Sequence, residues 1–162
     1  MKKISLLLLI LLLEVNVYAE QTIRVVCDNN YPPYSFINAG KLEGIVPDQW
    51  NLFSQETGVE VELVGMNWAE AIKQFNEGKF DVIDTIFETE ERKQIYLFTP
   101  AYATISVPIF IYKTISGISK IEDLRDFRVA VKTGDAAEEV LKKNGIEVIE
   151  YSDYESIVRA AA

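Results

Sequence analysis

The sequence predicts an α/β fold in which parallel strands alternate with amphipathic helices. From residue 23 onward, short apolar runs alternate with segments whose apolar residues recur at helical spacing. Glycine, asparagine or aspartate stands at most of the boundaries between them, as at helix caps and turns. The pattern restarts after residues 113–119, where Thr, Ser and Gly gather, so we expect a second, smaller unit there.

The N-terminus has the three-part layout of a secretory signal peptide. Lys2 and Lys3 precede an apolar run over residues 4–13, and Val17 and Ala19 are small residues at the two positions that a signal peptidase reads. The run is about ten residues long and a bilayer needs roughly 20. We therefore predict cleavage after residue 19 and an exported protein; the alternative is an uncleaved membrane anchor.

Composition excludes several classes of function. The formal net charge is −9, which disfavours binding to nucleic acid or to an anionic membrane. The single cysteine, Cys27, cannot form an internal disulfide. The absence of histidine excludes Ser-His-Asp and Cys-His catalysis and most zinc sites. We predict no enzyme activity, no cofactor and no metal.

The first unit has the elements of an open sheet with helical crossovers. Pro47 suits the first position of a helix, and Gly58 suits its end. Asn67 and Glu70 have the spacing of a capping box. The predicted elements are strands at residues 23–27, 59–64, 80–83 and 104–112, a hairpin turning at residues 38–40, helices at 47–57 and 67–77, and a helical turn at 89–92.

The second unit repeats this pattern over a shorter length. Asp135 and Glu138 form a second capping box, and Ser152 or Asp153 caps a last helix. The predicted elements are a turn at residues 121–124, strands at 127–131 and 146–149, a helix at 136–143, and a helix from 154 onward. Because the last helix still presents an unpaired apolar face, we expect the second unit to be incomplete.

Ligands in open α/β sheets gather at the carboxyl ends of strands. Three loops leave strands in this way, and they contribute aromatic rings, hydroxyls, a guanidinium and a helix N-terminus. This set suits a zwitterion: Arg92 for a carboxylate, Asp28 for an ammonium, and Tyr31 with Trp68 for an apolar or cationic side chain. The amide groups after Gly134 favour the same carboxylate.

Each of these residues also has a structural interpretation. Tyr31 can pack its own loop around two prolines, and Trp68 can belong to the core. Arg92 follows three glutamates, so a surface ion pair is an alternative, and Asp135 can be a helix cap only.

Taken in order, the motifs resemble those of the bacterial extracellular solute-binding proteins of family 3, the polar-amino-acid type. The resemblance covers residues 22–162. It rests on Asp-Asn-Asn-Tyr-Pro-Pro-Tyr at residues 28–34, Gly-Ile-Val at 44–46, Gly-Lys-Phe-Asp-Val-Ile at 78–83, Thr-Glu-Glu-Arg at 89–92, Phe-Thr-Pro-Ala-Tyr at 98–102 and Val-Ala-Val-Lys-Thr-Gly at 129–134.

The resemblance implies a periplasmic-binding-protein-like fold with two lobes joined by a hinge. Lobe 1 would span residues 20–113, and an incomplete lobe 2 residues 114–162. The implied pocket residues are Asp28, Tyr31, Trp68, Thr85 and Arg92 in lobe 1 and Thr133, Asp135 and Ala136 in lobe 2. The implied function is capture of an amino acid or related carboxylate for uptake through a membrane permease of the ABC type.

The chain departs from the family pattern at residues 84–87, where Asp-Thr-Ile-Phe replaces a serine-rich stretch. The sequence of this segment is more similar to that of family members fused to bacterial signalling proteins, which favours a ligand-sensing ectodomain as the alternative function. Some relatives are dehydratases, and Asp84 with Glu88 would be the candidate acid–base pair for such an enzyme.

Overall fold

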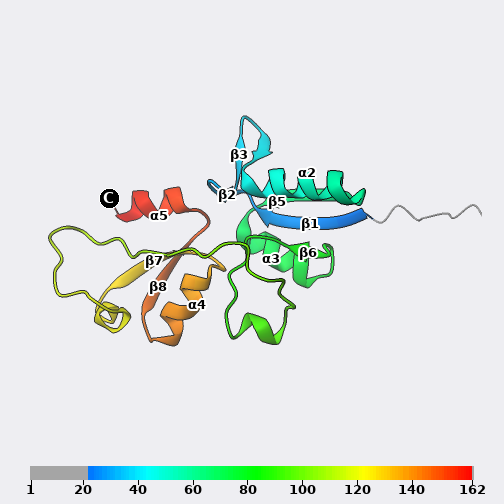
Figure 1. Cartoon of the computed structure of the whole chain (residues 1–162). Helices are drawn as coiled ribbons and strands as arrows, with labels where there is room; N and C mark the ends of the chain where they lie inside the picture. Colours follow the sequence, from blue (N-terminus) through cyan, green and yellow to red (C-terminus); the bar gives the residue numbers. More distant parts are fainter. Residues whose placement is uncertain (1–21, 162) are drawn as a thin grey trace, which may run out of the picture.

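The computed structural model describes residues 22–161, which fold around two separate parallel sheets (Figure 1). The strands are β1 Thr22–Asp28, β2 Asn30–Tyr31, β3 Ser35–Asn38, β4 Lys41–Glu43, β5 Glu60–Met66, β6 Val82–Ile83, β7 Arg128–Lys132 and β8 Glu147–Tyr151. The α-helices are α2 Ile45–Thr57, α3 Trp68–Asn76, α4 Ala136–Lys143 and α5 Tyr154–Ala161, and short 3-10 turns lie at Arg92–Gln94 and Ile121–Leu124.

The first sheet has the strand order β5-β1-β6, and both pairings are parallel. The central strand, β1, buries Val25, Val26 and Cys27 completely, as expected for a strand covered on both faces. Figure 1 shows α2 and α3 on opposite faces of this sheet. The predicted hairpin is present as β3 and β4, beside β2 in a small antiparallel sheet.

Three capping residues predicted from the sequence lie at helix ends in the structure, two at a start and one at a C-terminus. The Asn67 side chain accepts from Ala69 N at the start of α3, and Asp135 accepts from Ala137 N at the start of α4. Gly58 ends α2 with a positive φ of 72°. The reciprocal halves of the capping boxes differ from the prediction: Glu70 accepts from Gln74, and Glu138 accepts from the backbone of Gly134.

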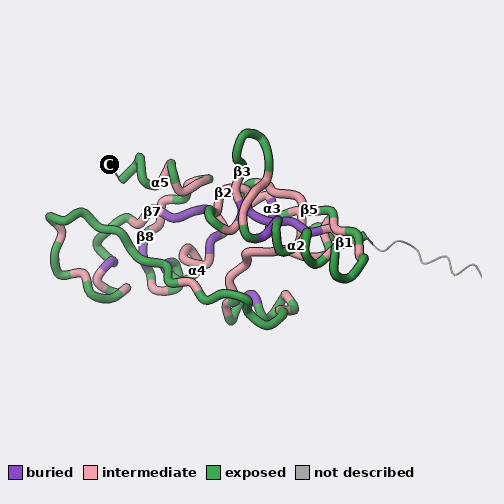
Figure 2. Tube along the Cα trace, turned by 45° about the horizontal axis from the view of Figure 1, so that its top comes forward, coloured by how far each residue is buried: buried purple, intermediate pink, exposed green. Residues whose placement is uncertain are grey.

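The second sheet pairs β7 with β8 in parallel and has its own small core. Its buried residues are Leu124, Val131, Leu141 and Ile146. Figure 2 shows burial concentrated along β1 and along β7, while the segment that connects the two sheets is exposed over most of its length.

The predicted strand at residues 104–112 is wrong. These residues have no regular structure, and Val107 and Phe110 are 56% and 90% exposed. A strand requires a partner for its backbone hydrogen bonds, and within residues 22–161 no strand pairs with this segment. The predicted strand at residues 80–83 shortens to β6. At Asp81 the side chain replaces a strand partner, because the backbone N–H of Arg24 donates to the Asp81 carboxylate.

The predicted signal peptide, residues 1–19, lies outside the described residues. Within residues 22–161, none of the helices has the length and apolar character needed to cross a bilayer.

Cys27 is expected to be inert to thiol reagents in the folded protein. Burial raises the pKa of its thiol to about 12, and the thiolate is the reactive form. At pH 8 an aromatic disulfide reagent should label the chain only after denaturation in guanidinium. Rapid stoichiometric labelling of the native chain would contradict the burial of β1.

Candidate ligand-binding site

The carboxyl ends of β1, β6 and β7 face one another across a cavity of about 10 Å³, close to the space of one water molecule. Its lining residues come from both sheets: Asp28, Tyr31, Trp68, Thr85, Phe87, Arg92, Asp135, Ala136 and Tyr154. The structure therefore brings seven of the eight predicted pocket residues together. Thr133 is the exception, because its hydroxyl donates to the Tyr151 carbonyl instead of facing the cavity.

Arg92 lies in this cavity and already holds a carboxylate of the protein. Its side chain is 6% exposed, and Nε and Nη2 lie 2.7 and 2.6 Å from Oε1 of Glu139, on α4 of the other sheet. Thr89 Oγ1 donates to the second oxygen of Glu139 at 3.0 Å. Arg92 is thus part of a buried carboxylate-binding arrangement and is not a solvated surface pair with its neighbouring glutamates.

Two further contacts anchor Arg92 and bring the second sheet close. Its Nη2 donates to the Gly134 carbonyl at 2.9 Å, and its Nη1 donates to the Phe87 carbonyl at 3.3 Å. The indole Nε1 of Trp68 donates to the same Gly134 carbonyl at 2.9 Å. Gly134 has a φ of +79°, and a Cβ there would lie 3.0 Å from Ile72 Cδ1, so only glycine suits this close approach.

A second ion pair joins the sheets at Asp28. The ammonium of Lys132, at the end of β7, lies 2.5 Å from Asp28 Oδ2 and 3.3 Å from the Asn30 carbonyl. The two side chains are 1% and 6% exposed. The Lys132 ammonium also lies 4.9 Å from the centre of the Tyr154 ring, within the range of a cation–π contact.

Tyrosines close one side of the cavity. The Tyr31 ring stacks on Tyr34 at 5.3 Å and tilts against Tyr154 at 6.1 Å. The Tyr154 hydroxyl donates to Asp135 at 2.6 Å, and burial, followed by this hydrogen bond to the carboxylate, raises the pKa of Tyr154. Asp135 is therefore both a helix cap and a wall of the cavity.

Thr85 adopts a left-handed backbone, with φ at 62°. This conformation is unfavourable for a β-branched residue and typically persists only where the surroundings hold it. Its hydroxyl donates to the Asp84 carbonyl at 2.6 Å, and the residue lines the cavity. Such backbone strain is frequent at binding sites, so it supports the prediction that Thr85 belongs to the pocket.

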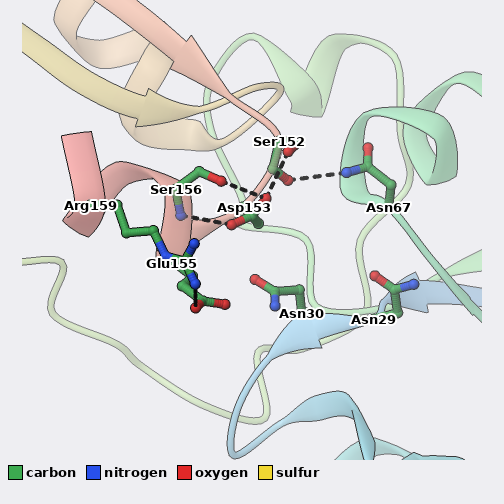
Figure 3. A pocket seen from close by; sticks show the side chains of 8 residues that line it. All are labelled: Asn29, Asn30, Asn67, Ser152, Asp153, Glu155, Ser156 and Arg159. Atoms are coloured by element: carbon green, nitrogen blue, oxygen red, sulfur yellow. Dashed lines mark hydrogen bonds and ion pairs between the residues drawn. The ribbon is translucent and has the colours of Figure 1, made fainter. Parts of the chain in front are cut away.

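A larger hollow of about 350 Å³ lies between parts of the same two units (Figure 3). Its lining is polar throughout: Asn29, Asn30, Asn67, Ser152, Asp153, Glu155, Ser156 and Arg159. Figure 3 shows Asn67 reaching the Ser152 carbonyl, a hydrogen bond of 3.0 Å, while Asp153 caps α5 through Ser156. Several of these residues adjoin Asp28, Tyr31 and Tyr154 in the chain, so this polar hollow lies near the smaller cavity.

Sequence reasoning did not select three residues that shape the site: Lys132, Glu139 and Tyr154. Tyr154 follows the carboxyl end of β8, so the rule that found the other loops applies to it as well. Glu139 lies four residues after Asp135, on the same face of α4. Within residues 22–161, no group of three His, Cys, Asp or Glu side chains is arranged to hold a metal ion.

Two α/β units whose strand ends face each other across a buried, charge-lined cavity form a periplasmic-binding-protein-like fold. The family model for bacterial extracellular solute-binding proteins, family 3, matches residues 23–157. The chain belongs to this family, and the fold class predicted from its sequence is confirmed.

Individual relatives agree with this assignment. The L-cystine-binding protein TcyJ of Escherichia coli K12 is 30% identical over 137 residues, which are 82% of this chain and 52% of TcyJ. A histidine kinase sensor domain with similarity to periplasmic binding proteins has a TM-score of 0.80 at 27% identity, over 88% of this chain and 64% of that one. An ancestral amino-acid-binding protein, AncCDT-1, described as a precursor of cyclohexadienyl dehydratase, has a TM-score of 0.72 at 30% identity, over 86% and 65%. The chain spans about half the length of the curated relatives it matches.

Proposed function

We propose that this chain is an exported solute-binding module that captures a small polar ligand, an amino acid or a related carboxylate, for uptake by an ABC-type permease. The observation that carries the proposal is the Arg92 guanidinium, buried between the two sheets and engaged with a carboxylate. A guanidinium can recognise a carboxylate through two N–H groups, and Nε and Nη2 of Arg92 both point at Oε1 of Glu139.

In this proposal the two sheets belong to two lobes that close on the ligand, with residues 20–113 and 114–162 on either side of the hinge. The ligand's carboxylate takes the place of Glu139 on Arg92. Tyr31 and Trp68 bound the ligand's side chain, and Asp28, Thr85, Asp135 and Ala136 complete the walls. Thr133 holds its loop in place without facing the ligand, because its hydroxyl and its backbone N–H both donate to the Tyr151 carbonyl. Contacts such as Trp68 to Gly134 form only in the closed state, so ligand binding and closure are coupled.

The names of the relatives support an amino acid as the ligand. They include an L-cystine-binding protein and an ancestral amino-acid-binding protein. Export is supported by the family, which is extracellular, and by the signal-peptide layout of residues 1–19. We infer a periplasmic location from these two observations.

A ligand-sensing ectodomain is the second candidate function. It is favoured by the TM-score of 0.80 to a histidine kinase sensor domain. The genes beside the coding sequence distinguish the two roles: a neighbouring permease gene selects transport, and a fused cyclase or kinase domain selects sensing.

Catalysis on this fold has less support in the geometry. Of the candidate acid–base pair, Asp84 accepts hydrogen bonds from Trp50 and Tyr102, and Glu88 pairs with Lys93. Both carboxylates are engaged with the protein's own donors, and neither lines the cavity. We therefore infer a binding protein and not a dehydratase.

A thermal-shift screen of the amino acids, followed by calorimetry, tests the proposed function. We expect at least one amino acid at millimolar concentration to raise the melting temperature, because a ligand that binds only the folded state stabilises it. The same compound with its carboxylate converted to an amide should have no effect, since Arg92 requires the carboxylate. Equal stabilisation by acid and amide would overturn the proposed role of Arg92.

A further inference from the structure

The Asp28–Lys132 pair assigns a preference to the ligand's side chain, an inference that rests on the proposed function. Asp28 is the one acidic side chain lining the cavity on the side of the first sheet, within residues 22–161. Left alone, this buried carboxylate would attract a cationic ligand group. In this chain the attraction is already satisfied by Lys132, a residue of the opposite sheet.

We propose that Lys132 is a specificity-determining residue: its ammonium occupies the cation subsite at Asp28, so that the pocket accepts amino acids with an uncharged or anionic side chain and rejects arginine and lysine. Three contacts fix the ammonium there. It is bonded to the Asp28 carboxylate, it lies 3.3 Å from the Asn30 carbonyl, and it faces the Tyr154 ring at 4.9 Å.

Burial makes this arrangement selective. The Lys132 side chain is 1% exposed, so it cannot swing into water to vacate the subsite while the sheets remain in contact. Because Lys132 neutralises Asp28, a second cation beside the pair would find no net attraction to offset the loss of its hydration, and it would lie near the like charge of the ammonium. No comparable penalty applies to a neutral ligand side chain.

Lys132 also explains how the cavity can close without leaving Asp28 unpaired. Asp28 Oδ1 accepts from the backbone of Asn30, and Oδ2 accepts from Lys132. Both oxygens therefore have donors before any ligand arrives. A ligand ammonium therefore adds little at this position.

The test compares the wild-type chain with Lys132→Ala and with the exposed control Lys41→Ala. Titration calorimetry with arginine, lysine, glutamine and cystine measures the preference. We expect the wild type and the Lys41 variant to bind neutral amino acids and reject basic ones. In Lys132→Ala the affinity for arginine relative to glutamine should rise about tenfold or more, because the subsite is empty and the like charge is gone. Tight arginine binding by the wild type would overturn the proposal, as would an equal change for all four ligands.

A second measurement does not depend on amino-acid binding. Propylammonium has the size of the deleted side chain, and it should raise the melting temperature of Lys132→Ala but not that of the wild type. Propanol, the uncharged analogue, should rescue neither. If propylammonium raises the melting temperature of Lys132→Ala but no amino acid binds, the cation subsite is retained and the proposed function fails. If propylammonium changes the melting temperature of both proteins equally, the subsite is excluded. If Lys132→Ala does not fold, Lys132→Met preserves the side-chain volume and is measured in the same way.

Discussion

Replacing Arg92 by alanine is expected to abolish amino-acid binding, with a loss of about a hundredfold or more in affinity. The guanidinium supplies two charge-assisted hydrogen bonds to a carboxylate, and each such bond contributes about 1.5–3 kcal/mol. Two of them at the lower value already correspond to about a hundredfold. Titration calorimetry with the best amino acid from the screen measures the loss, and circular dichroism verifies that the variant is folded.

Three variants separate recognition from general damage. Arg125→Ala removes an exposed arginine and should leave affinity unchanged. Arg92→Lys keeps the charge but loses the fork, so it should bind only weakly. Glu139→Gln should bind more tightly than the wild type, because the ligand's carboxylate no longer displaces a charged competitor from Arg92. Unchanged affinity in Arg92→Ala would rule out Arg92 as the carboxylate anchor.

Local chemistry explains why most elements could be predicted from the sequence. Asn67 and Asp135 cap α3 and α4 through bonds that span two residues, and Gly58 ends α2 through its own backbone freedom. The apolar run of β1 is the expected pattern for a strand buried on both faces. These signals lie within one or two turns of the chain, so a sequence pattern is sufficient to place them.

The segment at residues 104–112 marks the limit of that reasoning. Its apolar, β-branched composition predicts a strand, but composition carries no information about a partner. In the described residues the segment crosses between the two units without pairing, and its apolar side chains stay exposed. Strand propensity is a preference for a pleated, half-buried surface, which the rest of the fold must provide.

The candidate site shows the same division between residues that local patterns select and contacts that depend on the whole fold. The rule that ligands gather at strand ends, together with the family resemblance, selected Asp28, Trp68 and Arg92, and the structure brings them to one cavity. The partners of Asp28 and Arg92 are separated from them in sequence by 104 and 47 residues. No local pattern pairs such distant charges, so the pairing of Lys132 with Asp28 and of Glu139 with Arg92 became visible only in the structure.

These two ion pairs also explain how a cavity of about 10 Å³ can belong to a binding protein. Each joins a residue of the first unit to a residue of the second, so under the proposed function each replaces part of the contact that a ligand would provide. The ligand's carboxylate can compete for Arg92 because Glu139 remains 35% exposed and has water on its other side. Lys132 has no such exit, so under the proposed function the two pairs have different roles: the Glu139 pair yields to the ligand, and the Asp28 pair stays.

Replacing Asp28 by asparagine is expected to destabilise the folded chain by about 3–5 kcal/mol, the usual cost of leaving one partner of a buried ion pair without its counter-charge. The substitution preserves shape but removes the charge that the Lys132 ammonium faces, and both side chains are almost fully buried. Urea unfolding at pH 7, followed by circular dichroism, measures the free energy of unfolding. The loss should change little between low and high salt, because buried pairs are weakly screened.

The double variant Asp28→Asn with Lys132→Met separates the missing charge from damage to packing. Methionine removes the unpaired ammonium, so the double variant should be more stable than Asp28→Asn alone, and the two substitutions should be strongly non-additive. Asp81→Asn is the matched control: it breaks the Arg24 pair, whose side chains are 43% and 46% exposed, and should cause a much smaller change. Equal effects of Asp28→Asn and Asp81→Asn would mean that the pair between the sheets is solvated in solution and that the two units do not hold each other closed through Lys132.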